Sequence, residues 1–292
     1  MHASSPPVSL IETFSAIAER YDAVICDVWG VLHNGVRVTR QANEALNAMR
    51  ARGMAVVMLT NAPRPPADIE AFVRQLGAQG QVWDAVVSSG GVTRSIMAGH
   101  GARPFHHMGP ARDVSVYEGL AARKVALGEA DYVLCTGLVD DETETAEDYR
   151  PQLEAMLTRR IELICANPDI VVERGHKLVP CAGAIAELYE QMGGPVTWVG
   201  KPHPLVYDYA LGEIEKALSR PVERARILGI GDAIRTDVAG AKGYGIESLF
   251  ILDGIHGREA GLKDGSVDRQ AFSGFLARQT VQPRWAMPVL TF

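Results

Sequence analysis

The sequence lacks the features that mark several large classes of protein. Its 292 residues include four cysteines, which are far apart and lie mostly in apolar runs: Cys26, Cys135, Cys165 and Cys181. This spacing favours reduced, buried thiols over a disulfide framework or a zinc site. Basic residues are not in excess, because Lys and Arg number 29 against 35 Asp and Glu, for a formal net charge of −6. The charge balance argues against a nucleic-acid partner.

Long hydrophobic runs are also missing. No segment approaches the roughly 20 apolar residues that a membrane helix needs. The first seven residues, Met1–Pro7, contain no basic stretch leading into an apolar core, so we expect no secretory signal there. We therefore expect a cytoplasmic protein with no membrane partner, long enough for two domains or one large one.

The most informative stretch that is present spans residues 23–32. A short apolar run ends in Asp27, and Gly30 follows three positions later. A carboxylate at the end of a buried strand, followed by a tight turn, is well placed to act as a covalent nucleophile in phosphoryl transfer. A second apolar run ends in Thr60 and Asn61, whose hydroxyl and backbone N–H can contact a phosphate.

Two later segments carry compatible chemistry. Lys201 lies between a glycine and a proline, and a fixed ammonium there can neutralise phosphoryl oxygens and the carboxylate of Asp27. A third apolar run leads into Asp232, with Asp237 five positions further on. Carboxylate oxygens are suitable ligands for Mg²⁺. Asp237 either reaches the metal through water or caps a helix that begins near Thr236.

These four segments, in this order, resemble the motifs of the haloacid dehalogenase (HAD) superfamily, and more narrowly its class IIA, the nitrophenyl-phosphatase or NagD-like branch. Asn167–Asp169, Val179–Ala184 and Gly200–Pro202 are similar to further signals of that branch. The resemblance covers nearly the whole chain. It implies an α/β fold with a HAD-like Rossmannoid core containing a parallel sheet, and an inserted α/β cap domain. We expect the core to comprise residues 1–98 and 195–292 and the cap residues 99–194.

The resemblance also implies roles for particular residues. Asp27 would be the nucleophile and Lys201 its catalytic companion, while Thr60, Asn61 and Lys201 would bind the substrate, with Asn61 acting mainly through its backbone. Asp27, the backbone carbonyl of Trp29, Asp232 and Asp237 would hold Mg²⁺. The implied partner is a small phosphorylated metabolite. A homodimer through the cap is left open, because class IIA relatives often pair that way.

Trp29 departs from the family pattern. Phosphatases of this superfamily have Asp-x-Asp in the first motif, and the second Asp protonates the leaving oxygen and then activates water. Trp29 keeps a backbone carbonyl but has no acid–base group. A positioned general acid or base typically contributes about 10²–10⁴-fold in rate. His33 and His203 are candidates for a replacement, although a loop histidine with no catalytic role is the favoured interpretation.

Two functions therefore remain. The first is a Mg²⁺-dependent phosphatase that works through an aspartyl-phosphate, and the alternative is a phosphometabolite-binding or regulatory protein with little turnover. Carbon–halogen hydrolysis is less favoured because that chemistry does not need the metal carboxylate of Asp232. A dinucleotide site is disfavoured because Gly229 and Gly231 lead into Asp232 rather than completing G-x-G-x-x-G.

The local patterns predict alternating strands and helices and hence a parallel sheet. Ser9–Glu12 has the form of a capping box, which predicts that a helix opens there. The turn-rich segment 99–110 is interpreted as a crossing between domains.

Overall fold

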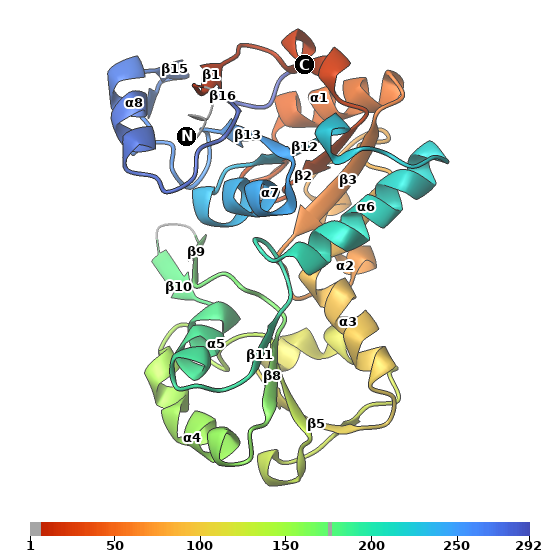
Figure 1. Cartoon of the computed structure of the whole chain (residues 1–292), viewed down its shortest axis with the longest axis vertical. Helices are drawn as coiled ribbons and strands as arrows, with labels where there is room; N and C mark the ends of the chain where they lie inside the picture. The colour runs from red at the N-terminus through yellow and green to blue at the C-terminus, as the bar shows by residue number, and fades with distance from the viewer. Residues whose placement is uncertain (1–6, 175–176) are drawn as a thin grey trace, which may run out of the picture. The chain divides into compact units, whose positions relative to one another are not determined.

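The computed structural model of this chain describes residues 7–174 and 177–292. The chain forms two compact units. One contains the segments ending at Thr60, Glu70–Val87 and Tyr207–Phe292, and the other contains Asn61–Ile69 and Ser88–Val206. Each unit is built on its own sheet with helices packed on it (Figure 1). The expected α/β class, a HAD-like core with a parallel sheet and a further α/β part, is confirmed.

The first unit contains a seven-stranded sheet, in which every neighbouring pair from the β1 edge to β3 is parallel. In spatial order its strands are β1 (Ser9–Leu10), β16 (Trp285–Met287), β13 (Glu247–Ile251), β12 (Ile227–Gly231), β2 (Ala23–Cys26), β3 (Ala55–Thr60) and β4 (Ala85–Ser88). β2, β3 and β12 are buried along their whole length. Continuous burial is expected of parallel strands covered on both faces, and it explains their unbroken apolar sequences.

Helices connect these strands. They are α1 (Arg40–Ala51), α2 (Pro66–Gln75), α6 (Pro204–Leu218), α7 (Ala239–Tyr244) and α8 (Arg269–Ala277), with the π-helical turn η7 (Ile234–Val238) and the 3₁₀ turns η1 (Phe14–Ala16), η2 (Ala18–Arg20) and η6 (Arg224–Arg226). A small hairpin joins β14 (Leu262–Lys263) to β15 (Ser266–Val267). Phe250, Phe272 and Phe275 contribute to the core between the sheet and α8. None of the helices in the described residues is long and apolar enough to cross a membrane.

The second unit contains a five-stranded sheet, in which all neighbouring strands are parallel. In spatial order its strands are β11 (Val196–Trp198), β8 (Glu162–Cys165), β7 (Tyr132–Cys135), β5 (Pro104–Met108) and β6 (Arg123–Lys124). Its other elements are α3 (Ser89–Gly99), α4 (Arg150–Thr158), α5 (Ala182–Gln191), the 3₁₀ turns η3 (Ala111–Val116), η4 (Leu127–Glu129) and η5 (Ala146–Tyr149), and the antiparallel pair β9 (Val171–Arg174) and β10 (Lys177–Pro180).

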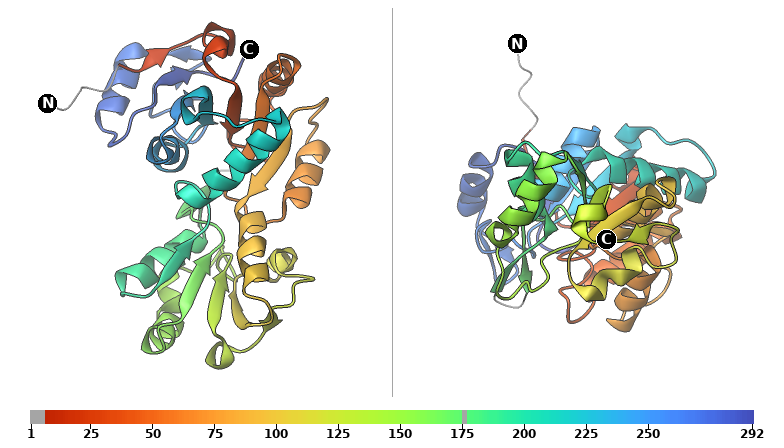
Figure 2. Two further views of the ribbon diagram at one scale, coloured as in Figure 1. Left: turned by 45° about the vertical axis from the view of Figure 1, so that its right-hand side comes forward. Right: turned by 90° about the horizontal axis from the view of Figure 1, so that it is seen from below.

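The two faces of this sheet are covered differently. Leu153 of α4 and Ile185 of α5 share a core with Val133 and Leu163 of the strands, so both helices cover one face (Figure 2). Because side chains alternate along a strand, Tyr132 points to the opposite face, where its ring stacks with that of Phe105 at 5.8 Å. That face also carries η3, since Tyr117, which caps it, packs against Phe105 at 5.2 Å.

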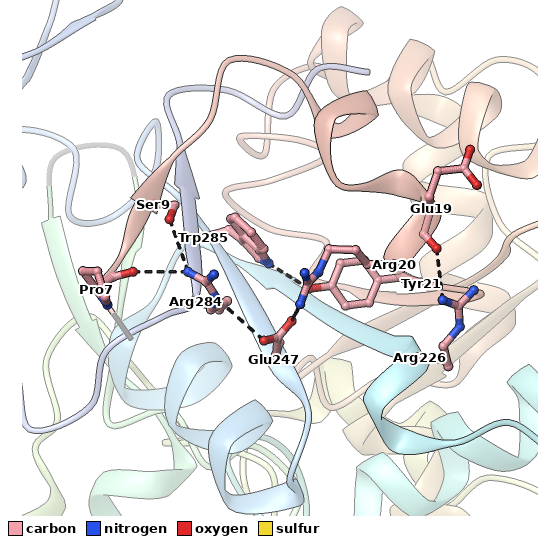
Figure 3. A network of polar contacts seen from close by, with 9 residues as sticks. All are labelled: Pro7, Ser9, Glu19, Arg20, Tyr21, Arg226, Glu247, Arg284 and Trp285. Carbon is pink, nitrogen blue, oxygen red and sulfur yellow. Dashed lines mark hydrogen bonds and ion pairs between the residues drawn. The ribbon is translucent and has the colours of Figure 1, made fainter. Parts of the chain in front are cut away.

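Two local predictions were wrong. Ser9–Leu10 form strand β1 rather than opening a helix, because the Ser9 N–H donates to the Arg284 carbonyl and Leu10 packs into the α8 core. Figure 3 shows how side chains reinforce this edge: Arg284 donates to Ser9 Oγ at 3.2 Å, and Trp285 donates to the Tyr21 hydroxyl at 2.7 Å. The second error is the segment 99–110, which contains β5, a strand within the second sheet.

Candidate active site

The first unit collects three carboxylates where parallel strands end. Asp27 follows β2 and Asp232 follows β12, and these strands are neighbours in register, with Cys26 beside Ile230. Asp237 lies inside η7. Each of the three carboxylates offers an oxygen, and these oxygens all lie within 4.8 Å of one another. All three side chains are buried, at 9%, 5% and 6% exposure in sequence order. Buried carboxylates this close repel one another unless a cation or protons compensate.

Glycines make room for these carboxylates. Gly30 has φ +86°, a backbone conformation that favours glycine, and a Cβ added there would lie 2.1 Å from Oδ2 of Asp232. A Cβ on Gly254 would meet the same oxygen at 2.1 Å, and one on Gly231 would meet Cγ of Asp237 at 2.1 Å. The glycine in the first motif is therefore required both by the turn and by the close approach of Asp232.

Backbone N–H groups orient all three carboxylates. Val28 N–H donates to Asp27 Oδ1 at 2.7 Å, Ile255 N–H to Asp232 Oδ2 at 2.9 Å, and Ala233 N–H to Asp237 Oδ2 at 3.1 Å. Three buried carboxylates with oxygens within 4.8 Å are a donor set that fits a hard divalent cation such as Mg²⁺. The helical turn η7 begins at Ile234 rather than near Thr236, and the Asp237 carboxylate accepts the N–H of Ala233, the residue that precedes this turn.

Thr60 is the last residue of β3, the strand beside β2, and it is buried at the same edge of the sheet as Asp27. Trp29 follows Asp27 by two positions. Its indole is 48% exposed, packs against Gly35, and meets the His33 ring edge-on at 5.2 Å between centroids. The first unit therefore contains Asp27, Thr60, Asp232 and Asp237 at one edge of its sheet, with Trp29 in the loop that follows Asp27.

His33 is poorly suited to replace the missing acid. It is 3% exposed, and its Nδ1 accepts the Gly35 N–H at 3.0 Å. Burial lowers the pKa of His33 to about 4, so the ring is neutral near pH 7. Phe72 also packs against it edge-on. These contacts indicate that His33 shapes the loop after Asp27.

Lys201 and Asn61 lie in the second unit, where the Asn61 side chain holds the lysine backbone. Asn61 Oδ1 accepts the Lys201 N–H at 2.7 Å, and its Nδ2 donates to the Lys201 carbonyl at 3.1 Å and to Asp169 Oδ1 at 2.9 Å. The expectation that Asn61 acts mainly through its backbone missed this role. The resemblance of Asn167–Asp169 to a family signal gives no role for Asp169, whose carboxylate accepts a hydrogen bond from the Asn61 amide.

His203 lies close to Lys201 in the same unit. Its ring stacks on that of Trp198 at 5.3 Å with an interplanar angle of 8°. Its backbone N–H donates to the Gly200 carbonyl, and burial lowers the pKa of the imidazole. The geometry explains His203 as part of the turn that carries Lys201.

The fold and these residues define an α/β protein whose core sheet gathers three buried carboxylates at its carboxyl edge. The family model for haloacid dehalogenase-like hydrolases matches residues 24–122, and a HAD-hydrolase-like model matches residues 198–272. A crystal structure of a haloacid dehalogenase-like hydrolase from Brucella suis 1330 is 41% identical, covers 96% of this chain and 100% of that chain, and has a TM-score of 0.82. The chain belongs to the haloacid dehalogenase-like hydrolases.

Curated relatives are more distant. D-glycerol 3-phosphate phosphatase of Mycobacterium tuberculosis is 26% identical over 256 residues, and the match covers 82% of this chain. The matched part is 65% of that relative's length, so this chain spans just under two thirds of it. Ribonucleotide monophosphatase NagD of Escherichia coli is 25% identical over 236 residues, covering 80% of this chain and 88% of that protein. The relation to NagD confirms the expected class IIA branch.

Proposed function

We propose that this hydrolase is a Mg²⁺-dependent phosphatase that removes the phosphoryl group from a small phosphorylated metabolite. The observation that carries the proposal is the buried cluster of Asp27, Asp232 and Asp237 at the ends of β2 and β12. The names of the relatives support it, since both act on phosphate monoesters by name. Cytoplasmic location and action on free metabolites, without nucleic acid or membrane, remain predictions that go with it.

In the proposed reaction a carboxylate oxygen of Asp27 forms a bond to phosphorus while the bond from phosphorus to the leaving oxygen breaks. The leaving oxygen takes its proton from solvent, because Trp29 has no proton to give. Water then attacks the phosphorus of the aspartyl-phosphate, which releases inorganic phosphate and restores Asp27. The proposed substrate contacts are the Thr60 hydroxyl, Asn61 and the ammonium of Lys201.

Asp27, Asp232, Asp237 and the carbonyl of Trp29 would hold the metal. When bound, Mg²⁺ supplies positive charge that offsets both the carboxylates and the phosphoryl oxygens. The glycines at positions 30, 231 and 254 keep space for these carboxylates, and the N–H groups of Val28, Ala233 and Ile255 fix their orientation. These residues therefore hold the nucleophile, Asp27, in position before a substrate binds.

Phosphate release from nitrophenyl phosphate and a panel of metabolite phosphomonoesters tests the proposal, with Mg²⁺ and with a chelator. We expect Mg²⁺-dependent release, reduced about 10³-fold or more by Asp27→Asn, because the amide cannot form the acyl phosphate. Asp264→Asn is the matched control, since Asp264 is an exposed turn residue of the same unit. Full activity in Asp27→Asn would falsify the covalent mechanism.

The loss of the acid–base group at Trp29 favours the alternative of a phosphometabolite-binding protein with little turnover. The same panel separates the two, because tight Mg²⁺-dependent binding without phosphate release is expected only for the binding protein. Release that does not respond to the chelator would contradict the role of the metal.

A further inference from the structure

Three short segments of the second unit that resemble family signals come together in the fold. They are Asn167–Asp169, Val179–Ala184 and Gly200–Pro202. The N–H of Gly183, in the first turn of α5, donates to the Asp169 carbonyl at 3.2 Å, and the Asp169 N–H donates to Asn167 Oδ1 at 3.2 Å. Gly200 lies against Pro168, since a Cβ on the glycine would be 2.5 Å from Cγ and Cδ of the proline. The backbone of Asp169 is therefore held on both sides, next to the turn that carries Lys201.

The Asn61 amide bonds to both peptide groups that flank the Cα of Lys201. Its Oδ1 accepts the Lys201 N–H at 2.7 Å, and its Nδ2 donates to the Lys201 carbonyl at 3.1 Å. These two bonds fix the peptide planes before and after the lysine, and hence the direction of its Cα–Cβ bond. Asn61 and Lys201 are 5% and 4% exposed, so bulk water has little access to either bond.

The glycine before the lysine allows this close approach. Gly200 has φ +136°, and a Cβ there would be 2.7 Å from Asn61 Oδ1. A side chain at position 200 would therefore push the amide away from the Lys201 N–H. The requirement for glycine in this segment thus follows from the contact with Asn61 as well as from the backbone angle.

Asp169 determines which way round the Asn61 amide lies. The amide Nδ2 also donates to Asp169 Oδ1, at 2.9 Å. If the amide were turned by 180°, its oxygen would face this carboxylate and its NH₂ group would face the Lys201 N–H. Two acceptors would then meet on one side and two donors on the other. Because a carboxylate only accepts, Asp169 excludes the turned form and keeps both bonds to Lys201 in place.

We infer that Asp169 is a positioning residue for the proposed reaction, and that through Asn61 it holds the ammonium of Lys201 where the phosphoryl group binds. This inference rests on the proposed function, in which Lys201 contacts phosphoryl oxygens. The lysine stem is buried and cannot freely readjust if its Cα–Cβ direction changes. A misplacement of about 1 Å in such a group can cost on the order of 10²-fold in rate.

The test measures the affinity for inorganic phosphate in the presence of Mg²⁺ by calorimetry, and kcat/KM for nitrophenyl phosphate. We expect Asp169→Ala to lower both roughly ten- to a hundred-fold. Asp169→Asn keeps an oxygen that can accept from Asn61 Nδ2, so it should retain most of the wild-type affinity and kcat/KM. Asp131→Ala is the control and should change neither quantity, because Asp131 is an exposed carboxylate of the same unit.

A double-mutant cycle with Lys201→Met separates positioning from a general structural role. Lys201→Met removes the ammonium and keeps the backbone that Asn61 holds. In that background Asp169→Ala should cause little further loss of phosphate affinity, because no ammonium is left to misplace. An equal loss in both backgrounds overturns the inference, since Asp169 would then act on something other than Lys201. An equal loss in Asp169→Asn and Asp169→Ala also overturns it, because the charge of Asp169 rather than its acceptor oxygen would then matter.

The same variants distinguish this inference from the proposed function. Unchanged affinity and turnover in Asp169→Ala, with Asp27→Asn inactive, overturns the inference and leaves the proposed function standing. If the wild type binds phosphate without turnover, the proposed function fails, and the phosphate affinities of the same variants decide the inference. If the wild type neither binds nor releases phosphate, both fail. If Asp169→Ala does not fold, Asp169→Leu, which has nearly the shape of aspartate and no acceptor, replaces it with the same outcomes.

Discussion

The two sheets place different chemistry at the same kind of position. Both are parallel and both have one switch point at their carboxyl edge. In the seven-stranded sheet that position holds three carboxylates with oxygens within 4.8 Å, each oriented by a backbone N–H. In the five-stranded sheet it holds a hydroxyl and an imidazole, since Thr136 Oγ1 lies 2.9 Å from His107 Nε2.

The two edges differ in charge, and this difference determines which ligands each edge can bind. We call the carboxyl edge of the seven-stranded sheet the first edge and that of the five-stranded sheet the second edge. Burying three carboxylates without a cation costs free energy, so the first edge is suited to a metal and a phosphoryl group. The hydroxyl of Thr136 and the imidazole of His107 satisfy each other by a hydrogen bond, so the second edge carries no comparable cluster of negative charge among the described residues. A strand end, a tight turn and a glycine recur at both edges, and the side chains decide the ligand.

Trp29→Asp is expected to have the largest effect on activity, because it adds the missing acid–base group to the first edge. We expect kcat for alkyl phosphates, whose leaving oxygen needs a proton, to rise by about tenfold or more. Nitrophenolate leaves without protonation, so the first step with nitrophenyl phosphate should change less. In the wild type a burst followed by slow turnover is expected, since no base activates the hydrolytic water. Rapid-quench measurement of leaving-group release tests both statements, because the phosphoryl group stays on Asp27 until water attacks.

The matched control is Trp29→Asn, which has the same shape as Trp29→Asp without a titratable group. Both substitutions remove the indole from Gly35 and His33, so a gain shared by the two comes from space rather than proton transfer. Brisk hydrolysis of alkyl phosphates by the wild type, with no gain in Trp29→Asp, would show that another group supplies the proton. His203 would then be substituted first, since the pKa and contacts of His33 disfavour it.

Gly30→Ala tests how far the first edge depends on close approach. Alanine at φ +86° costs about 1–3 kcal/mol of unfolding free energy, and its Cβ would also press on the Asp232 carboxylate. Gly53→Ala is the matched control, because Gly53 has φ +82° and a Cβ there would meet nothing within 4 Å. We expect a larger loss of unfolding free energy in urea for Gly30→Ala, and weaker Mg²⁺ binding in that variant alone. Equal losses of unfolding free energy in the two variants, with unchanged Mg²⁺ affinity, would contradict the conclusion that Gly30 leaves space for the Asp232 carboxylate.

The first edge could be predicted from sequence because its signals are local. Apolar runs that end in Asp27, Thr60 and Asp232 mark buried parallel strands, and such strands end at one edge. The second edge could not be predicted in this way. His107 belongs to β5 and Thr136 directly follows β7, and these strands pair only in the fold, so no spacing in the sequence connects them.

The remaining errors have similar causes. Pro104–Met108 lies among turn residues, and its strand character depends on pairing with β6 and β7. Ser9–Leu10 have the local form of a helix start, but pairing with β16 outweighs it. The sequence predicts only a backbone role for Asn61, because its side-chain partners, Lys201 and Asp169, lie more than a hundred residues away. Long-range hydrogen bonds of this kind leave no periodic signal.

The smallest predicted effect concerns the pH dependence of stability, and it arises at the second edge. Burial lowers the pKa of His107 to about 4, with Lys124 and His106 adding to the effect, while the unfolded value is about 6.5. Between pH 4 and about 6.5 the unfolded chain binds a proton at His107 and the folded chain does not. The unfolding free energy therefore falls as pH falls through this range. At pH 5.5 the loss is about 1 kcal/mol for this group.

His33 has the same shift, and Asp113, whose pKa is raised, acts in the opposite direction at lower pH. His107→Gln, which keeps a donor for Thr136, should therefore flatten the slope of urea-unfolding free energy between pH 7 and 5 without abolishing it. An unchanged slope in that variant would mean that the folded and unfolded chains bind a proton at His107 equally well, which would contradict a neutral imidazole at the second edge.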